Sequence, residues 1–213
     1  MTRTASADST REKLYAAGLR RFARDGWRTA RVRDIVADAG QGNDSAVNYH
    51  FGSRQGLLEE VLHRGVDAME AERRADLERL GTAPEAEALV DAVVRPLAAL
   101  LDTAEGRSFL RIAGQLGPLA TVTDTLVAVP TAGTALEHEM TLLVAALTER
   151  IGARPARARL AAMIVMLTAA LAARAAELDA AEPDADGGTT DPDYRDDLVR
   201  TITAGLLTPP AGH

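Results

Sequence analysis

The spacing of apolar residues constrains the fold of this chain more than any other feature. From Leu14 onward, apolar residues recur every three to four positions, which is the period of an α-helix with one buried face. The strict alternation of a half-buried strand does not occur anywhere in the sequence. Glycine and proline interrupt the pattern repeatedly, so the sequence predicts an all-α protein built from separate helices.

Three short helices are predicted near the N-terminus, after a loose arm over residues 1–9. The first begins at a Thr10 cap and ends at Gly26. The second spans residues 32–39, and the third spans residues 43–51 with Asn43 as its cap. Two short helices joined by a glycine-containing turn form a helix-turn-helix pattern.

The third helix has an unusually polar surface for its length of about two turns. Val47 and Phe51 share one face at i, i+4 spacing, and Gly18 in the first helix permits a neighbouring helix to approach closely. The remaining side chains of the third helix are polar or amphipathic: Asp44, Ser45, Asn48, Tyr49 and His50. We interpret this face as a contact surface and the helix as a DNA-recognition helix.

The rest of the chain is predicted to be helical as well. A long helix capped by Ser53 runs to about Leu80, and its charged second half, residues 70–79, is expected to be solvated. Further helices are predicted over residues 84–103, 105–116, 134–151, 155–180 and 193–207, with a loop over residues 182–192. The apolar run 160–173 is too short to span a bilayer and is interpreted as a buried helix, so no membrane partner is expected.

Charge and aromatic residues divide the chain into two unlike parts. Residues 1–54 carry a net charge of +4 and residues 55–213 a net charge of −11, and five of the seven aromatic residues lie in the first part. A basic block on an acidic body is expected when one end binds a polyanion. The chain has no cysteine and no apolar leader, which favours a cytoplasmic location.

Three segments carry a resemblance to a known family. They are Leu14–Trp27 (LYAAGLRRFARDGW), Val32–Gly40 (VRDIVADAG) and Val47–Leu58 (VNYHFGSRQGLL). Together they resemble the DNA-binding domain of the TetR family of bacterial transcriptional regulators, over roughly residues 10–62. Two departures are Arg31, where the family usually has Thr or Ser, and a segment 41–51 that is one residue longer than the common family version.

The resemblance implies a domain organisation and a set of DNA contacts. A helix-turn-helix domain over residues 10–55 would be joined by the long helix to a ligand-binding and dimerisation domain over residues 56–208. Tyr49 and His50 are placed like family residues that touch phosphates, and Arg54 could hold another phosphate. The candidates for contacts with base edges are Arg33, Ser45, Asn48 and Asp44. The full expected DNA-binding set is Arg31, Arg33, Asp44, Ser45, Asn48, Tyr49, His50 and Arg54.

The resemblance also implies three partners. They are a second copy of the chain in a homodimer, a double-stranded DNA operator and an unknown small-molecule effector. The candidate effector-binding residues are Phe109, Arg111, Gln115, Glu137, His138, Met140, Met163 and Met166. The candidate dimer-interface residues are Leu160, Ile164, Leu167, Leu171, Leu198 and Ile202, although such apolar stripes suit an intramolecular core equally well.

An enzyme is not expected. His138-Glu139 lacks the second histidine of a zinc-protease helix because residue 142 is Leu, and no phosphate-binding glycine loop occurs. No metal site or cofactor is therefore predicted. The predicted function is a ligand-responsive transcriptional regulator, most simply a repressor released from a palindromic operator by its effector. The alternatives are a ligand-independent DNA-binding regulator and an all-helical small-molecule carrier or enzyme.

Overall fold

The computed structural model describes residues 2–82, 84–120, 131–180 and 192–209, and all regular structure in these ranges is helical. The α-helices are α1 (Thr2–Asp25), α2 (Val32–Asp38), α3 (Ser45–Phe51), α4 (Arg54–Leu80), α5 (Ala86–Ala99), α6 (Ala104–Ala120), α7 (Ala135–Ile151), α8 (Ala153–Ala180) and α9 (Pro192–Leu207). A short 3-10 helix, η1 (Leu100–Asp102), follows α5. The all-α fold class is confirmed.

The first helix is longer than predicted. It begins at Thr2 instead of Thr10, and no glycine or proline stands between these residues to stop it. The loop predicted over residues 182–192 lies outside the described residues except for Pro192, where α9 begins.

The first three helices and the start of α4 enclose one core. Leu14, Phe22, Ile35, Val47 and Leu57 are all fully buried in it. Gly18 of α1 faces α4 so closely that a Cβ atom there would lie 2.7 Å from Leu57 Cδ2. The predicted close approach at Gly18 is confirmed.

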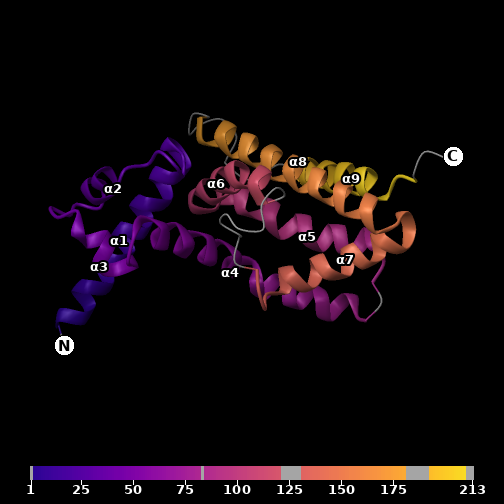
Figure 1. The fold of residues 1–213 in the computed structure, drawn as a ribbon, viewed down its shortest axis with the longest axis horizontal. Helices are drawn as coiled ribbons and strands as arrows, with labels where there is room; N and C mark the ends of the chain where they lie inside the picture. Colours follow the sequence, from indigo (N-terminus) through magenta and orange to yellow (C-terminus); the bar gives the residue numbers. More distant parts are fainter. Residues whose placement is uncertain (1, 83, 121–130, 181–191, 210–213) are drawn as a thin grey trace.

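Helix α4 connects this small N-terminal unit to the rest of the molecule (Figure 1). The hydroxyl of Ser53 accepts a hydrogen bond from the Gly56 N–H at its start, as expected for an N-cap. The helix then runs for 27 residues to the Gly81 C-cap, where φ is +72°. Its length carries it from beside α3 to beneath α5 and α7 (Figure 1).

The larger unit is a bundle of α5 to α9 with an aliphatic core. Leu101, Leu110, Leu147, Leu171 and Ile202 are buried in it. Helix α6 belongs to both cores, because Phe109, Ile112 and Leu116 pack in the N-terminal core and Leu110 packs in the bundle.

Helix α8 differs from its predicted role as a buried helix. It spans 28 residues and is long and apolar enough to cross a bilayer by length and composition alone. Only 22% of its most apolar 18-residue window is buried within the chain. The expectation failed because the helix extends well beyond the run 160–173, and its Ala-rich outer face has no covering helix among the described residues.

Candidate nucleic-acid interface

The turn between α2 and α3 is fixed by backbone hydrogen bonds. Gly40 adopts φ +67°, a conformation that favours glycine, and the Gln41 N–H donates to the Val36 carbonyl over 3.0 Å. At the other end of α2, Arg31 is the N-cap in extended conformation and makes no side-chain cap hydrogen bond. The hydroxyl of Thr29 donates instead to the Asp25 carbonyl at the end of α1, so it does not cap α2.

The helix α3 begins at Ser45 with Asp44 as its N-cap, so the prediction that Asn43 is the N-cap is wrong by one residue, although Asn43 still bonds to the first turn. Its Oδ1 accepts the Ser45 N–H over 2.9 Å, and its carbonyl accepts the Ala46 N–H over 3.0 Å. Val47 is fully buried, which anchors the inner face of the helix. Phe51 is only half-buried, and the Arg11 guanidinium lies 5.1 Å from its ring centroid.

The outer face of α3 consists of the side chains singled out by the sequence. Asp44, Ser45 and Asn48 are exposed, and Tyr49 is 81% exposed. The rings of Tyr49 and the half-buried His50 meet edge to face with centroids 4.8 Å apart. Among the described residues, Tyr49 is the large hydrophobic side chain that is exposed, and it stands with polar neighbours on a face that the rest of the chain leaves open.

The three predicted arginines have different surroundings. Arg31 is exposed, and Arg33 is 66% exposed in its side chain with Nε 3.4 Å from Asp34 Oδ1. Arg54 is directed into its own domain. Its guanidinium donates to the carbonyls of Ala30, over 2.9 Å, and Trp27, and burial lowers its pKa.

Arg54 therefore holds the turn between α1 and α2 by satisfying carbonyls that no helix uses. Two of its donors are engaged within the protein, which reduces what it can offer a phosphate. No sequence spacing could reveal this role, because Arg54 and Trp27 are 27 residues apart.

A second arginine also has its partner within the N-terminal unit. The Nε atom of Arg21 on α1 lies 2.5 Å from Asp38 Oδ2 on α2. The Arg21 guanidinium holds the pKa of the Asp38 carboxyl below its usual range. This ion pair fixes the angle between α1 and α2, and hence supports the position of α3.

Polar contacts connect the N-terminal unit to α6. The Tyr15 hydroxyl donates to Glu105 over 2.9 Å, and Gln115 Oε1 accepts the Trp27 N–H over 3.1 Å. Between α1, α4 and α6 lies a cleft of about 480 Å³ lined by Tyr15, Arg64 and Glu105 among others. Gln115, a predicted effector residue, thus joins the two parts of the molecule.

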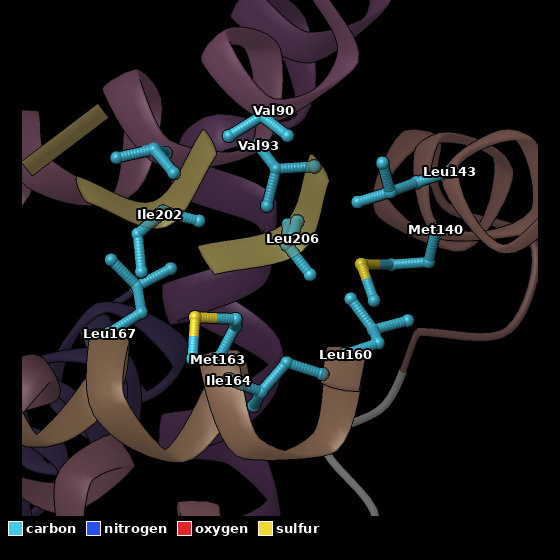
Figure 2. Close-up of a pocket in the computed structure, with 11 residues that line it drawn as sticks. Val90, Val93, Met140, Leu143, Leu160, Met163, Ile164, Leu167, Ile202 and Leu206 are labelled. Atoms are coloured by element: carbon cyan, nitrogen blue, oxygen red, sulfur yellow. The ribbon is translucent and has the colours of Figure 1, made fainter. Parts of the chain in front are cut away.

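Two of the predicted effector residues meet at a small apolar cavity in the bundle (Figure 2). Met140 of α7 and Met163 of α8 line it together with residues of α5 and α9, including Val93 and Leu206. Its volume is about 20 Å³, which is room for about one water molecule. An effector would have to enlarge it.

The other predicted effector residues lie elsewhere. Phe109 is buried in the N-terminal core, and Arg111 pairs with Asp179 over 3.5 Å. Glu137 and His138 are exposed near the start of α7, where Glu137 accepts the Gly133 N–H over 2.7 Å. Met166 is half-buried against the bundle core.

The predicted dimer residues are packed within one subunit. Five of the six are less than 10% exposed, and Ile164 is half-buried: Leu160, Leu167, Leu171, Leu198 and Ile202 form the buried group. A different row of α8 is exposed and apolar. It consists of Ala158, Ala162, Val165, Ala169, Ala173 and Ala176, and we name it the α8 stripe. Val165 in this row is half-buried and the others are exposed.

Metal binding finds no support in the described ranges. No group of three or more His, Asp or Glu side chains lies close enough to hold an ion there.

Comparison with known proteins finds one matching family model and 17 similar chains among the solved structures, of which three follow. A candidate TetR-family transcriptional regulator from Rhodococcus sp. is 20% identical, with 93% of this chain and 99% of that chain covered and a TM-score of 0.49. A candidate transcriptional regulator from Streptomyces coelicolor A3(2) is 22% identical, with 93% and 99% covered and a TM-score of 0.45. A structure described as the molecular basis for control of antibiotic production by a bacterial hormone is 20% identical, with 92% and 97% covered and a TM-score of 0.48.

No curated protein matches the chain. Because the TM-scores are below 0.5, only the family model bears on the family that the chain resembles. That model, described as bacterial regulatory proteins of the tetR family, matches residues 14–61, which include the helix-turn-helix and the exposed face of α3. Members of this family are DNA-binding regulators and not enzymes. Residues 14–61 of this chain are therefore similar to the domain that this model describes in the tetR family of bacterial regulatory proteins.

Proposed function

We propose that this protein is a cytoplasmic, ligand-responsive transcriptional repressor that binds a palindromic DNA operator as a homodimer and is released by a small-molecule effector. Residues 10–55 bind DNA, and residues 56–208 bind the effector and the second subunit. The observation that carries the proposal is the exposed polar face of α3, with Tyr49 81% exposed, in a domain that matches the family model.

The exposed residues of α3 suit two kinds of DNA contact. The Tyr49 hydroxyl and the His50 ring nitrogens are hydrogen-bonding groups at the rim of α3, suited to phosphate oxygens. Asp44, Ser45 and Asn48 present donors and acceptors for base edges, and Arg33 on α2 suits guanine. Val47 and the hydrogen bonds of Asn43 hold this face rigid, so it needs little reordering on binding.

The α8 stripe supports a homodimer. Its residues recur every three to four positions along one exposed face, and alanine permits close contact between helices. A second α8 would cover apolar surface that the chain leaves open. Twofold pairing also doubles the number of base pairs read, which a seven-residue recognition helix needs for useful discrimination.

The apolar cavity between α5, α7, α8 and α9 supports a lipophilic effector. All of its lining side chains are aliphatic or methionine, and methionine adapts readily to a new neighbour. An effector that separates these helices would move α5 and α7, which both pack on α4. The effector acts only if it binds the two arrangements of α4 with different affinity.

DNA binding is tested by fluorescence anisotropy with the promoter DNA beside the gene for this protein, compared with random duplex over a range of salt. Sequence-preferring binding that weakens steeply with salt is expected. The double variant Tyr49→Ala, His50→Ala should bind more weakly and reduce the salt slope by about one for each lost phosphate contact. Glu149→Ala, at an exposed position in the last turn of α7, is the matched control. Equal affinity for both duplexes at every salt concentration contradicts the proposal.

The dimer is tested by sedimentation of Val165→Glu, which places a charge in the α8 stripe. The variant is expected to sediment as a folded monomer, because an unpaired charge in an apolar interface is costly. Ala145→Glu, on the exposed side of α7, should sediment as the wild type does. A wild-type mass for Val165→Glu would show that the stripe is not the interface.

The effector is sought with a thermal-shift screen of lipophilic compounds, since a ligand that binds the folded state raises its melting temperature. A compound that raises the melting temperature should also release the promoter DNA. If no compound shifts the melting temperature while DNA binding is retained, the ligand-independent regulator is the better description.

A further inference from the structure

One ion pair is buried in the bundle, away from the DNA-binding face. Arg73 of α4 is 1% exposed and Glu139 of α7 is 0% exposed, and they are the only buried charged residues among those described. An Nη1 atom of Arg73 donates to Oε2 of Glu139. The sequence predicted that residues 70–79 are solvated, and that prediction is wrong for Arg73 because α7 covers this side of α4.

The same guanidinium reaches a third helix at a site created by proline. Pro96 lies inside α5 and has no N–H, so the carbonyl of Ala92, four residues earlier, lacks its helical donor. Arg73 Nη1 donates to that carbonyl over 3.3 Å, and Nη2 donates to the neighbouring carbonyl of Val93 over 3.2 Å. Arg73 therefore fills a gap in the hydrogen bonding of α5.

These contacts fix α4 in position. One side chain from α4 is held by a carboxylate of α7 and by two carbonyls of α5, and the planar guanidinium meets them only in a narrow range of orientations. A second link lies one turn away, where both carboxylate oxygens of Glu70 accept the Ala135 N–H over 3.0 Å. A displaced α4 would leave a buried charge without partners.

The ion pair shares residues with the apolar cavity. The Val93 carbonyl accepts from Arg73 while the Val93 side chain lines the cavity, and Met140, which follows Glu139, lines it too. Figure 2 shows Val93 and Met140 on the cavity wall. Widening the cavity by moving α5 or α7 would therefore displace an acceptor of Arg73.

We propose that Arg73 is the positioning residue of α4: it sets where α4 lies against α5 and α7, and so where the α3 face stands relative to the bundle. The consequence for DNA rests on the proposed function, whereas the positioning itself does not. Buried ion pairs are often replaced by apolar residues without loss of stability, so stability alone does not explain why three helices converge on this charge.

The experiment measures a distance within one chain, without DNA. The protein has no cysteine, so Ala37→Cys on α2 and Glu149→Cys on α7 give two unique exposed sites for spin labels. The labelled chain is diluted into unlabelled protein so that only distances within one chain contribute. The distance distribution is then recorded by pulsed electron paramagnetic resonance in each Arg73 background.

Two variants at Arg73 are used, both chosen so that the protein still folds. The double variant Arg73→Met, Glu139→Leu removes both charges and keeps the site filled, and Arg73→Lys keeps the charge but cannot bridge both α5 carbonyls. In both we expect a broadened distribution with a shifted mean, while circular dichroism shows that the helices are retained. Arg79→Met, near the end of α4, has a 72% exposed side chain that pairs only with Asp76 of the same helix; it is the matched control and should retain the wild-type distribution.

A wild-type distribution in both folded variants would overturn the proposal and leave Arg73 as a packing residue. Promoter binding by the same proteins separates this result from the proposed function. If the wild-type chain does not bind promoter DNA, the proposed function is refuted and the distance result still stands. Normal DNA binding with unchanged distances would refute only the role of Arg73.

Discussion

The N-terminal core and the bundle core are both helical, but they place their charged residues differently. Around the N-terminal core, ion pairs such as Arg21 with Asp38 lie at the surface and join one helix to the next. In the bundle, the pair formed by Arg73 and Glu139 is buried and joins α4 to α7. The bundle has surface ion pairs as well, such as Arg95 with Asp196, so the buried pair is what distinguishes it. A change inside the bundle would act on α4 through Arg73 and Glu139, which are separate from the ion pair that joins α1 to α2.

The largest expected effect is on the buried pair. Arg73→Met should lower the free energy of unfolding by about 3–5 kcal/mol, because it leaves Glu139 without its partner. Arg21→Met should cost only about 1 kcal/mol, since that pair is partly exposed to water. Urea denaturation of both variants checks the contrast, with Arg79→Met as the exposed control on α4. Equal losses for Arg73→Met and Arg21→Met would remove the distinction between the two cores.

A pH series addresses the same pair by another route. Burial raises the pKa of the Glu139 carboxyl to about 7, and Arg73 opposes this rise. The folded protein therefore holds a proton that the unfolded chain releases near pH 4.5, so this group's stabilisation is complete below pH 4.5 and is lost as the pH rises to 7.

Glu139→Gln keeps an acceptor for Arg73 but does not titrate. The difference in unfolding free energy between wild type and Glu139→Gln should fall over this window, by at most about 1.4 kcal/mol per pH unit. Urea denaturation at several pH values measures the difference. A constant difference would show that Glu139 has an ordinary carboxyl pKa in the folded protein.

The junction between the two cores gives an effect of intermediate size. A Cβ atom on Gly65 of α4 would lie 2.0 Å from Cε2 of Phe109 on α6, so Gly65→Ala must displace a buried ring. We expect a loss of about 1–3 kcal/mol. Gly18→Ala should cost less, because the end of the Leu57 side chain can shift and alanine favours the helix by about 1 kcal/mol. Thermal unfolding of the two variants compares them, and a larger loss at Gly18 would contradict this account.

The smallest expected change in stability is at the DNA-binding face. Tyr49→Ala should alter the free energy of unfolding by no more than about 0.5 kcal/mol, because its ring is 81% exposed and contributes little to the core. The same variant should bind promoter DNA more weakly. If Tyr49→Ala destabilised the fold as much as Gly65→Ala does, the tyrosine would be a packing residue rather than a contact residue.

Much of the N-terminal unit could be predicted because local signals determine it. The helix ends are set near Gly40, Asn43 and Ser53, whose hydrogen-bond partners lie only a few residues away in the sequence. Val47 follows the helical spacing of apolar residues. Arg54 and Arg21 could not be interpreted in this way, since their partners lie 27 and 17 residues away. Helical periodicity shows which face of a helix is polar, but it does not show which carbonyl or carboxylate that face will meet.

The bundle was predictable as helices and not as a site. The leucines of α8 were predicted for either a dimer interface or an intramolecular core. Leu160, Leu167 and Leu171 pack inside the subunit, and the α8 stripe is the apolar row that remains open. Sequence hydrophobicity favours leucine as the contact residue, whereas burial by α5 and α9 decides which row remains open. In the same way, the local sequence does not distinguish Arg73 from its exposed neighbours, because its burial depends on α7.

Helix α6 restricts how the two cores can move relative to each other. Its successive residues Phe109 and Leu110 face opposite cores, and one residue corresponds to about 100° around a helix axis. On the side that faces α8, Gly114 comes so close that an added Cβ would lie 2.5 Å from Ala172. Rolling α6 about its axis would drive Phe109 out of one core and Leu110 out of the other. Both cores therefore oppose rotation of α6 about its axis, and we expect a displacement of the bundle to reach the N-terminal core as a translation or tilt of this helix.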